Sequence, residues 1–256
     1  MLIDSHCHLD RLDLKAYDGQ LEPVMQLAAE QGVEGFLCVG TDMARWQPMM
    51  ELIAPYSQVL ASVGVHPLSD EIAQIDGDTL IQAANHPRVV AIGETGLDYH
   101  YSGDTAEQQQ RSFECHLDAA SRCSKPVIVH TREAQQDTLR ILGQRLGPAG
   151  GVMHCFTETL EMAQQAVEMG MYISFSGIIT FRNADDLREV VRQIPLERIL
   201  VETDAPYLTP VPHRGRPNEP RFVREVAQCV ADLKGLHFDQ VVEQTGANFK
   251  QLFQQN

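Results

Sequence analysis

The chain has 256 residues, of which 43% are hydrophobic, and its formal net charge is −15. This length suits one large domain or two small ones, and the apolar content is enough for a sizeable core. The negative charge argues against a protein that binds nucleic acid through a broad basic face, but it leaves open a nucleic acid held at a small local site.

No apolar run approaches the ~18 residues that a membrane span requires. The N-terminal segment lacks the basic region of a secretory signal peptide. The six cysteines form no C-x-x-C pair, and several lie inside apolar runs, as buried free thiols do. We therefore expect a protein of a reducing, cytoplasmic compartment that does not associate with membranes.

Short apolar runs rich in β-branched residues alternate with longer amphipathic stretches along the whole chain. The runs that predict strands are Met1–Asp4, Gly35–Val39, Val59–Val65, Val89–Gly93, Val127–Val129, Gly151–Met153, Tyr172–Ser174 and Ile199–Glu202. The stretches that predict helices include Leu21–Gln31, Glu107–Arg122, Ala134–Leu142, Leu160–Glu168, Ala184–Val191, Arg221–Leu233 and Phe238–Phe253. Strands that alternate with helices form a parallel sheet, and eight such units in about 250 residues predict a (β/α)8 barrel with the last helix as an addition.

An open doubly wound sheet is the alternative architecture. Such a sheet more often carries a glycine-rich phosphate loop after its first strand, whereas His6, Cys7 and His8 follow the first strand here. The barrel is therefore favoured. Because no linker, repeat or low-complexity tract divides the chain, we expect residues 1–256 to form a single domain.

Histidines and carboxylates gather at the ends of the predicted strands. Five of the ten histidines do so, together with two acidic residues, and the set is His6, His8, His66, Glu94, His130, His154 and Asp204. The carboxyl ends of the strands form the active-site face of a barrel, so these side chains should meet there. His6 and His8 should share one face of their strand, because side chains two residues apart point the same way. By contrast, His86, His116 and His237 are expected on helix surfaces.

This set suits a metal site. Imidazole and carboxylate are the usual ligands of Zn²⁺, Mn²⁺ and similar ions. A catalytic zinc ion usually takes three protein ligands, so four histidines and two carboxylates suit two ions about 3.5–4 Å apart. Glu94 lies on a middle strand and is the natural bridge. His66, which precedes Pro67, could be a ligand or could merely orient a neighbour. Alternatively, the whole set could be structural, with side chains that form hydrogen bonds at the strand ends and bind no metal.

Seven short motifs along the chain are similar to those of a known family. D-S-H-C-H-L-D, V-G-V-H-P, G-E-T-G-L-D-Y, V-I-V-H-T-R, H-C-F-T, I-S-F-S-G and E-T-D-A-P-Y-L resemble the TatD family of metal-dependent deoxyribonucleases, and most closely its YcfH-like bacterial branch. The resemblance runs from Asp4 into the C-terminal helices. The motifs are specific as a set, although no single one would be.

The resemblance implies a (β/α)8 barrel of the amidohydrolase-like, metal-dependent hydrolase type that cleaves phosphodiester bonds in DNA. It also implies two divalent metal ions per subunit, which could be Zn, Mg or Mn. By this resemblance one ion is held by His6, His8, Glu94 and Asp204, and the other by Glu94, His130 and His154. Two such ions against the charges of Glu94 and Asp204 would leave the site locally cationic, which reconciles an anionic substrate with an acidic chain.

The two carboxylates of this set, Glu94 and Asp204, are the candidate catalytic residues. Asp204 is the candidate general base, since a carboxylate that touches both metal and water can take a proton, but it could also be a ligand only. Glu94 is expected to hold both ions. Glu202, two residues before Asp204, could support a ligating histidine or belong to a buried ion pair.

Further side chains are candidates for substrate binding, and His66 is one of them. Arg132 lies just beyond His130 and could reach a phosphate, or it could form a salt bridge with Glu133. The loop P-V-P-H-R-G-R-P is locally basic, and phosphate contact by His213 and Arg214 is favoured over a merely solvated loop.

Aromatic residues and cysteines also lie near the expected site. Tyr99 and Tyr101 should lie near its rim, where they could stack on bases or pack against the barrel. Cys7 and Cys155 adjoin expected ligands, but strand alternation should turn both thiols away from the site, so we interpret them as core residues.

Two other functions stay open. Barrels with an H-x-H first strand also hydrolyse C–N bonds in cyclic amides, and many bridge their ions with a carboxylated lysine at the end of the fourth strand. Glu94 takes that place here and the nearest lysine is Lys125, which favours phosphodiester chemistry. A non-catalytic metal-binding partner module is disfavoured by the intact ligand set. We expect DNA or another phosphodiester as the binding partner, and no obligate protein partner is evident.

Overall fold

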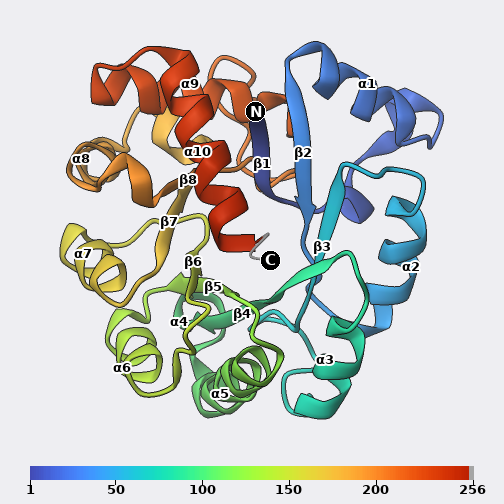
Figure 1. The fold of residues 1–256 in the computed structure, drawn as a ribbon, viewed down its shortest axis with the longest axis vertical. Helices are drawn as coiled ribbons and strands as arrows, with labels where there is room; N and C mark the ends of the chain where they lie inside the picture. The colour runs from blue at the N-terminus through green and yellow to red at the C-terminus, as the bar shows by residue number, and fades with distance from the viewer. Residues whose placement is uncertain (254–256) are drawn as a thin grey trace.

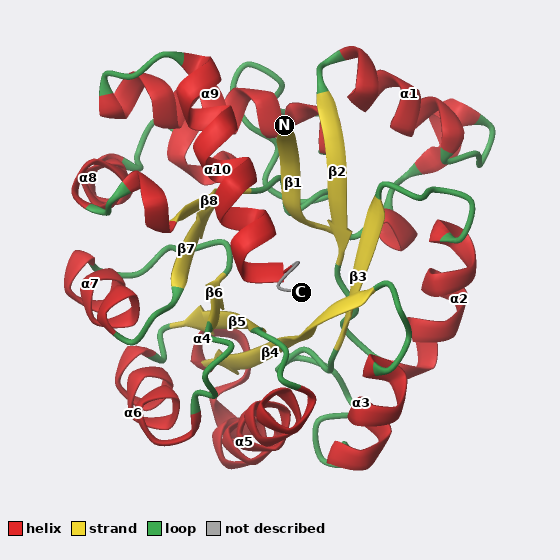
Figure 2. Ribbon diagram, viewed as in Figure 1, coloured by secondary structure: helices red, strands yellow, loops and turns green. Residues whose placement is uncertain are grey.

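The computed structural model describes residues 1–253, and within them eight parallel strands pair in chain order inside a ring of helices (Figures 1 and 2). The strands are β1 (Leu2–Cys7), β2 (Val33–Cys38), β3 (Val59–Val63), β4 (Val89–Asp98), β5 (Val127–Arg132), β6 (Gly151–Met153), β7 (Tyr172–Phe175) and β8 (Ile199–Val201). Every predicted strand is present, and the predicted (β/α)8 barrel is confirmed. Strands β4 and β5 run several residues further than their apolar runs indicated, because their polar ends continue the ladder.

The seam between the first and last strands is closed by individual hydrogen bonds. The backbone N–H of Asp204 donates to the carbonyl of His6 at 2.9 Å, and that of His8 donates to Ala205 at 2.8 Å. The hydroxyl of Ser5 adds a bond to the carbonyl of Val201 at 2.9 Å. The bonds that close the barrel therefore also fix His6, His8 and Asp204 relative to one another.

Amphipathic helices surround the strands. They are α1 (Glu22–Glu30), α2 (Met43–Ile53), α3 (Gly77–Ala84), α4 (Tyr99–Ser102), α5 (Ala106–Cys123), α6 (Gln135–Arg145), α7 (Leu160–Glu168), α8 (Asp185–Gln193), α9 (Val223–Lys234) and α10 (Phe238–Phe253). Acidic caps set some of their starts: Asp42 accepts a hydrogen bond from Arg45 N at the start of α2, and Asp76 accepts one from Thr79 N at the start of α3. Among the described residues, no helix is long and apolar enough to cross a membrane.

The interior of the barrel is apolar and closed at its amino end. Inward-facing residues of the strands form one cluster with the last helix, and they include Ile3, Leu37, Ala91, Ile128, Val152, Leu200, Phe249 and Phe253. Helix α10 crosses the middle of the barrel in Figure 1. Its Asn248 donates to the carbonyls of Leu196 and Ile199 at the start of β8, at 2.8 Å each. Because the amino end is filled with apolar groups, polar side chains collect at the opposite end.

Irregular pairing at two strand ends aims side chains at the carboxyl face. Ser5 contacts Ser174 inside the barrel, yet the next residue, His6, also points inward, so the alternation of β1 shifts by one residue. The ladder between β1 and β2 is irregular over this stretch. Strand β4 has a similar irregularity just before Thr95. There Gly93 has a φ of +141°, and a Cβ on it would lie 2.7 Å from the carbonyl oxygen of Ile128, so only glycine fits.

Candidate metal centre

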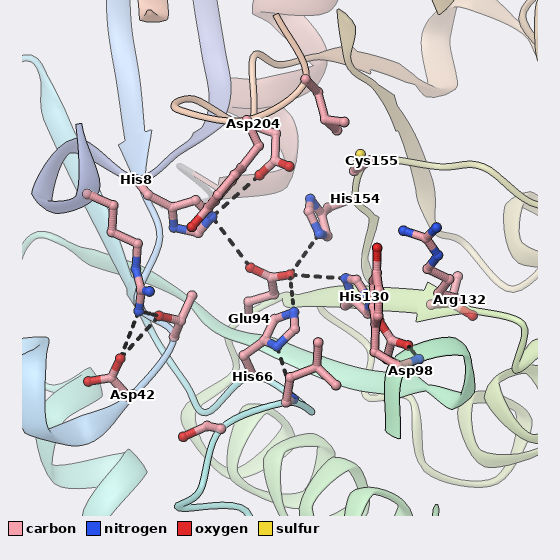
Figure 3. Close-up of a pocket in the computed structure, with 18 of the residues that line it drawn as sticks. His8, Asp42, His66, Glu94, Asp98, His130, Arg132, His154, Cys155 and Asp204 are labelled. Atoms are coloured by element: carbon pink, nitrogen blue, oxygen red, sulfur yellow. Dashed lines mark hydrogen bonds and ion pairs between the residues drawn. The ribbon is translucent and has the colours of Figure 1, made fainter. Parts of the chain in front are cut away.

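A pocket of about 760 Å³ opens at the carboxyl end of the barrel. Most of the predicted ligands line it, and His8, Glu94, His130, His154 and Asp204 converge on its floor (Figure 3). His6 is 1% exposed and lies beneath this floor. The structure therefore brings together the six residues that the resemblance implied as ligands.

One group of ligand atoms surrounds Oε2 of Glu94. His6 Nε2 lies 3.3 Å and His8 Nε2 lies 3.8 Å from this oxygen. Asp204 Oδ1 is 3.7 Å from His6 Nε2 and 3.4 Å from His8 Nε2, and the two Nε2 atoms are 3.3 Å apart. Four ligand atoms from three separate segments of the chain therefore face a common point.

A second group surrounds the other oxygen of the same carboxylate. Oε1 of Glu94 lies 2.8 Å from His154 Nε2, 3.3 Å from His130 Nδ1 and 3.3 Å from His66 Nε2. One carboxylate thus presents a different oxygen to each group, which is the arrangement that a bridging ligand requires.

The spacing of these atoms fits divalent ions. Ligand atoms that share a tetrahedral zinc ion at about 2.0–2.1 Å lie roughly 3.4 Å from one another. The first group, with spacings from 3.3 to 3.8 Å, matches that value. In addition, His154 Nε2 is buried and faces Oε1 of Glu94 at 2.8 Å, while Nδ1 of the same ring is paired with Glu202. A buried imidazole and a carboxylate that face each other are the usual ligands of Zn²⁺ and similar ions, so the residues fit the metal that their chemistry predicts.

Hydrogen bonds at the far sides of the rings orient three of the histidines. His130 Nε2 is 3.1 Å from Asp98 Oδ2, His154 Nδ1 is 3.1 Å from Glu202 Oε1, and His8 Nδ1 is 3.1 Å from the carbonyl of Val39. Each ring donates to an oxygen through one nitrogen, so its other nitrogen keeps a lone pair directed at the pocket. The support for His154 from Glu202 was one of two alternatives in the sequence. Asp98 was not predicted, although it follows Glu94 in the motif G-E-T-G-L-D-Y.

His66 has the opposite arrangement. Its Nδ1 accepts a hydrogen bond from the backbone N–H of Leu68 at 3.1 Å. In a neutral ring the proton must then be on Nε2, which is the atom that faces Glu94. Such a nitrogen donates a hydrogen bond and has no lone pair for a metal. His66 therefore borders the centre as a hydrogen-bond donor, and its orienting or substrate-contacting role stays a prediction.

The imidazoles keep both carboxylates of the centre ionised. Burial alone would raise the pKa of Glu94, but the neighbouring rings, above all His154 and His66, hold the pKa well below its usual range. Burial likewise opposes ionisation of Asp204, and the contact with His8 lowers its pKa below the ordinary value. Two anionic groups are thus available as ligands at neutral pH.

Arg132 and Tyr101 form a pair on the rim of the pocket. The guanidinium carbon of Arg132 lies 4.8 Å from the centre of the Tyr101 ring, and this ring is 66% exposed. Glu133, the alternative partner of Arg132, pairs instead with His100 at 2.6 Å. Among the described residues, Arg132 forms no ion pair, whereas the other arginine of the pocket, Arg11, pairs with an aspartate.

Three predicted substrate-binding residues lie outside the pocket. The hydroxyl of Tyr99 donates to Asp137 at 3.0 Å. His213 contacts Glu225 at 2.7 Å, and Arg214 donates to the carbonyl of Thr209 at 3.1 Å. Because these side chains already have partners elsewhere, their role in substrate binding stays a prediction that the geometry does not favour.

The two cysteines that adjoin ligands behave differently. Cys7 is fully buried and its thiol donates to the carbonyl of Leu37, as predicted for a core residue. Cys155 lines the pocket, so the prediction that it turns away was wrong. The reason is its φ of +42°, which breaks the strand alternation directly after His154.

A parallel barrel with a histidine and carboxylate centre at its carboxyl end is typical of metal-dependent hydrolases. Residues 3–254 match the family model described as TatD related DNase. The chain is 47% identical over 253 residues to the uncharacterized metal-dependent hydrolase YcfH of Escherichia coli K12, which covers 98% of this chain and 95% of that protein. The chain therefore belongs to the TatD family, and it is a metal-dependent hydrolase.

Two further relatives support this assignment. The Shigella flexneri protein named 3'-5' ssDNA/RNA exonuclease TatD is 37% identical over 240 residues, with 91% of this chain and 92% of that protein covered. The crystal structure of YjjV, a TatD homologue from Escherichia coli K12, superposes with a TM-score of 0.90 at 29% identity and covers 100% of this chain and 98% of that one.

Proposed function

We propose that this protein is a two-metal hydrolase that cleaves phosphodiester bonds in DNA. The observation that carries the proposal is the orientation of the Glu94 carboxylate. Its two oxygens face two separate groups of ligand atoms. The name of the Shigella relative, an exonuclease for single-stranded DNA and RNA, supports a nucleic-acid substrate.

The ligand set divides between two ions. His6, His8, Asp204 and Oε2 of Glu94 would hold one ion, and His130, His154 and Oε1 of Glu94 would hold the other. When bound, a pair of divalent ions stabilises the negative charge that develops on the attacking and leaving oxygens of a phosphodiester. Zn²⁺, Mg²⁺ and Mn²⁺ are all candidates, and the histidine-rich set favours Zn²⁺.

Asp204 is the proposed general base. Its side chain is 13% exposed, compared with 3% for Glu94, so it is the carboxylate that an attacking water reaches first. One of its oxygens faces His6 and His8, and the side chain borders the pocket. A carboxylate in this position can accept the proton of the water while it also serves as a ligand.

The rim provides contacts for the rest of the substrate. Among residues 1–253 no carboxylate forms an ion pair with Arg132, which packs on the ring of Tyr101. Its guanidinium can donate paired hydrogen bonds to a phosphate. Tyr101 offers an exposed ring on which a base can stack, irrespective of its identity. His66 directs an N–H toward the centre and can donate to a phosphate oxygen.

Hydrolysis of a C–N bond in a cyclic amide is the second function within reach of the same fold. Lys125, the nearest lysine, donates to the carbonyl of Ala84 at 2.6 Å, on the amino side of the barrel. It cannot reach the carboxyl end to act as a carboxylated bridge. Because Glu94, and not a lysine, faces both groups of ligand atoms, phosphodiester chemistry is better supported.

A substrate comparison tests the proposal. Purified protein is given a single-stranded oligonucleotide or a dihydropyrimidine, each with added Mg²⁺, Mn²⁺ or Zn²⁺, and chelated protein is the control. We expect metal-dependent cleavage of the oligonucleotide only. Turnover of the amide without cleavage of the oligonucleotide would replace the proposal with the second function. Failure of metal-replete protein to turn over either substrate would favour a non-catalytic module.

A further inference from the structure

A second acidic side chain, Glu202, lies behind the metal centre. It follows β8 and is fully buried, and it does not line the pocket. Its Oε1 lies 3.1 Å from His154 Nδ1, on the side of the ring that faces away from Glu94. Glu202 therefore contacts a ligand of the second group from the rear.

The same carboxylate lies close to a ligand of the first group. The rings of His6 and His154 stack at 3.9 Å between centres with an angle of 14° between their planes. Ligand atoms of His6, His154 and Glu202 lie within 4.8 Å of one another. This spacing is within reach of a direct contact after a small rotation, or of a contact through one water molecule.

Two unpartnered polar atoms point to what this arrangement does. His6 Nδ1 and Glu202 Oε2 are both buried, and neither has a hydrogen-bond partner among residues 1–253. His6 faces Glu94 and Asp204 through Nε2, so its proton belongs on Nδ1 when Nε2 acts as a ligand. His6 Nδ1 is thus a donor without a partner, and Glu202 Oε2 is an acceptor without a partner. Buried polar groups of this kind are normally paired.

We propose that Glu202 is a positioning residue that orients one ligand of each metal group. Its Oε1 accepts the proton of His154 Nδ1, and its Oε2 accepts that of His6 Nδ1. Both rings then present a lone pair at Nε2 to the centre, where Glu94 bridges from the other side. The inference rests on the proposed two-metal function. Glu202 would then be a second carboxylate bridge, which links the two metal groups through His6 and His154 and touches no metal.

Asp98 provides a matched comparison within the same chain. It is also buried and accepts from a ligand, since its Oδ2 is 3.1 Å from His130 Nε2. Its other oxygen, however, accepts from the backbone N–H of Tyr101 at 2.9 Å and so serves no second ligand. Loss of Asp98 should weaken one metal group, whereas loss of Glu202 should weaken both.

The test compares Glu202→Gln with Asp98→Asn by titration of the metal-free proteins with Zn²⁺ against a competing chelator. Each substitution removes a charge at nearly constant volume. In Glu202→Gln one ring faces an NH2 group and the other keeps an acceptor without negative charge, so we expect both dissociation constants to rise by about 10–100-fold. Only one constant should rise in Asp98→Asn. An increase in only one constant of Glu202→Gln would overturn the inference. Uptake of a single ion by the wild-type protein would refute the two-metal function itself.

Nitrogen-15 NMR of the histidine rings in the zinc-loaded wild type gives a second readout, which does not depend on the folding of a variant. We expect His6 and His154 each to carry a proton on Nδ1. In Glu202→Gln an NH2 group, which cannot accept, replaces one of the two acceptor oxygens, so one of the two rings should lose this signature. A wild-type His6 without a proton on Nδ1 would overturn the assignment of Oε2 to that ring.

Discussion

The buried histidine of α5 predicts how stability depends on pH. His116 was expected on a helix surface, but it is fully buried. Its Nε2 accepts a hydrogen bond from the backbone N–H of Val65 at 2.9 Å, and its Nδ1 donates to the carbonyl of Ser112 at 2.7 Å. Burial lowers the pKa of His116 from its ordinary value of 6.5 to about 4. The contact also anchors the residue that precedes His66.

The sign and size of the effect follow from this pKa. Between pH 6.5 and 4 the unfolded chain binds a proton at this ring that the folded chain does not bind. The stability contributed by His116 is therefore complete above pH 6.5, and it is lost as the pH falls toward the folded-state pKa. The loss amounts to about 2 kcal/mol by pH 5 and to about 3 kcal/mol when the ring is fully protonated.

The assay is urea unfolding of the wild type and of His116→Gln at pH 7.5 and pH 5, both in the presence of a metal chelator. Glutamine keeps an acceptor for the N–H of Val65 but does not titrate. We expect the wild type to lose about 2 kcal/mol more than the variant over this interval. The other histidines are present in both proteins, so their titration cancels in the difference. Equal losses in the two proteins would refute the neutral, buried state of His116.

The remaining predictions concern the metal centre. Glu94→Ala should lose activity and the binding of both ions, as measured by metal analysis of the purified protein, and wild-type rates would contradict the bridging role. His66→Phe should keep the metal content of the wild type while kcat/KM falls about 10–100-fold, since a hydrogen bond to a charged group contributes about 1.5–3 kcal/mol; loss of an ion would show that His66 is a ligand. Arg132→Ala should raise KM for an oligonucleotide about tenfold with little change in kcat, and Arg132→Lys should raise it less. An unchanged KM in Arg132→Ala would remove this residue from the substrate contacts.

The position of the candidate ligands could be predicted because a parallel barrel brings all strand ends to one rim. For this reason His130 and Glu94, which are 36 residues apart in the chain, were expected to meet. The orientation of the ligands could not be predicted in the same way. The shift in β1 that turns His6 inward and the glycine geometry before Glu94 arise from pairing between strands, which the alternation of one strand does not reveal.

The burial of His116 could have been predicted from the spacing of apolar residues in its helix, but its residue type favoured the surface. Phe113, His116, Leu117 and Ala120 follow the spacing of one helix face, and all four are buried. The period of α5 therefore placed the ring in the core, although histidine is only moderately common there. Cys155 carried no such signal. Its exposure to the pocket depends on a positive φ, which neither the residue type nor the surrounding apolar run predicts.

The charges around the centre bear on how many ions it holds. Glu94 and Asp204 lie among the ligands, and Asp98 and Glu202 accept from ligating histidines, so four carboxylates surround rings that are neutral when they bind metal. Buried charge without compensation is costly, and a single divalent ion would balance only two of these groups. Two divalent ions balance all four. With the proposed two ions, the site would therefore be nearly neutral, in place of the locally cationic site expected from Glu94 and Asp204 alone. In the proposed function, attraction of a phosphate would then come from the ions at close range and from Arg132 on the rim, which is why the substitution of Arg132 should act on KM.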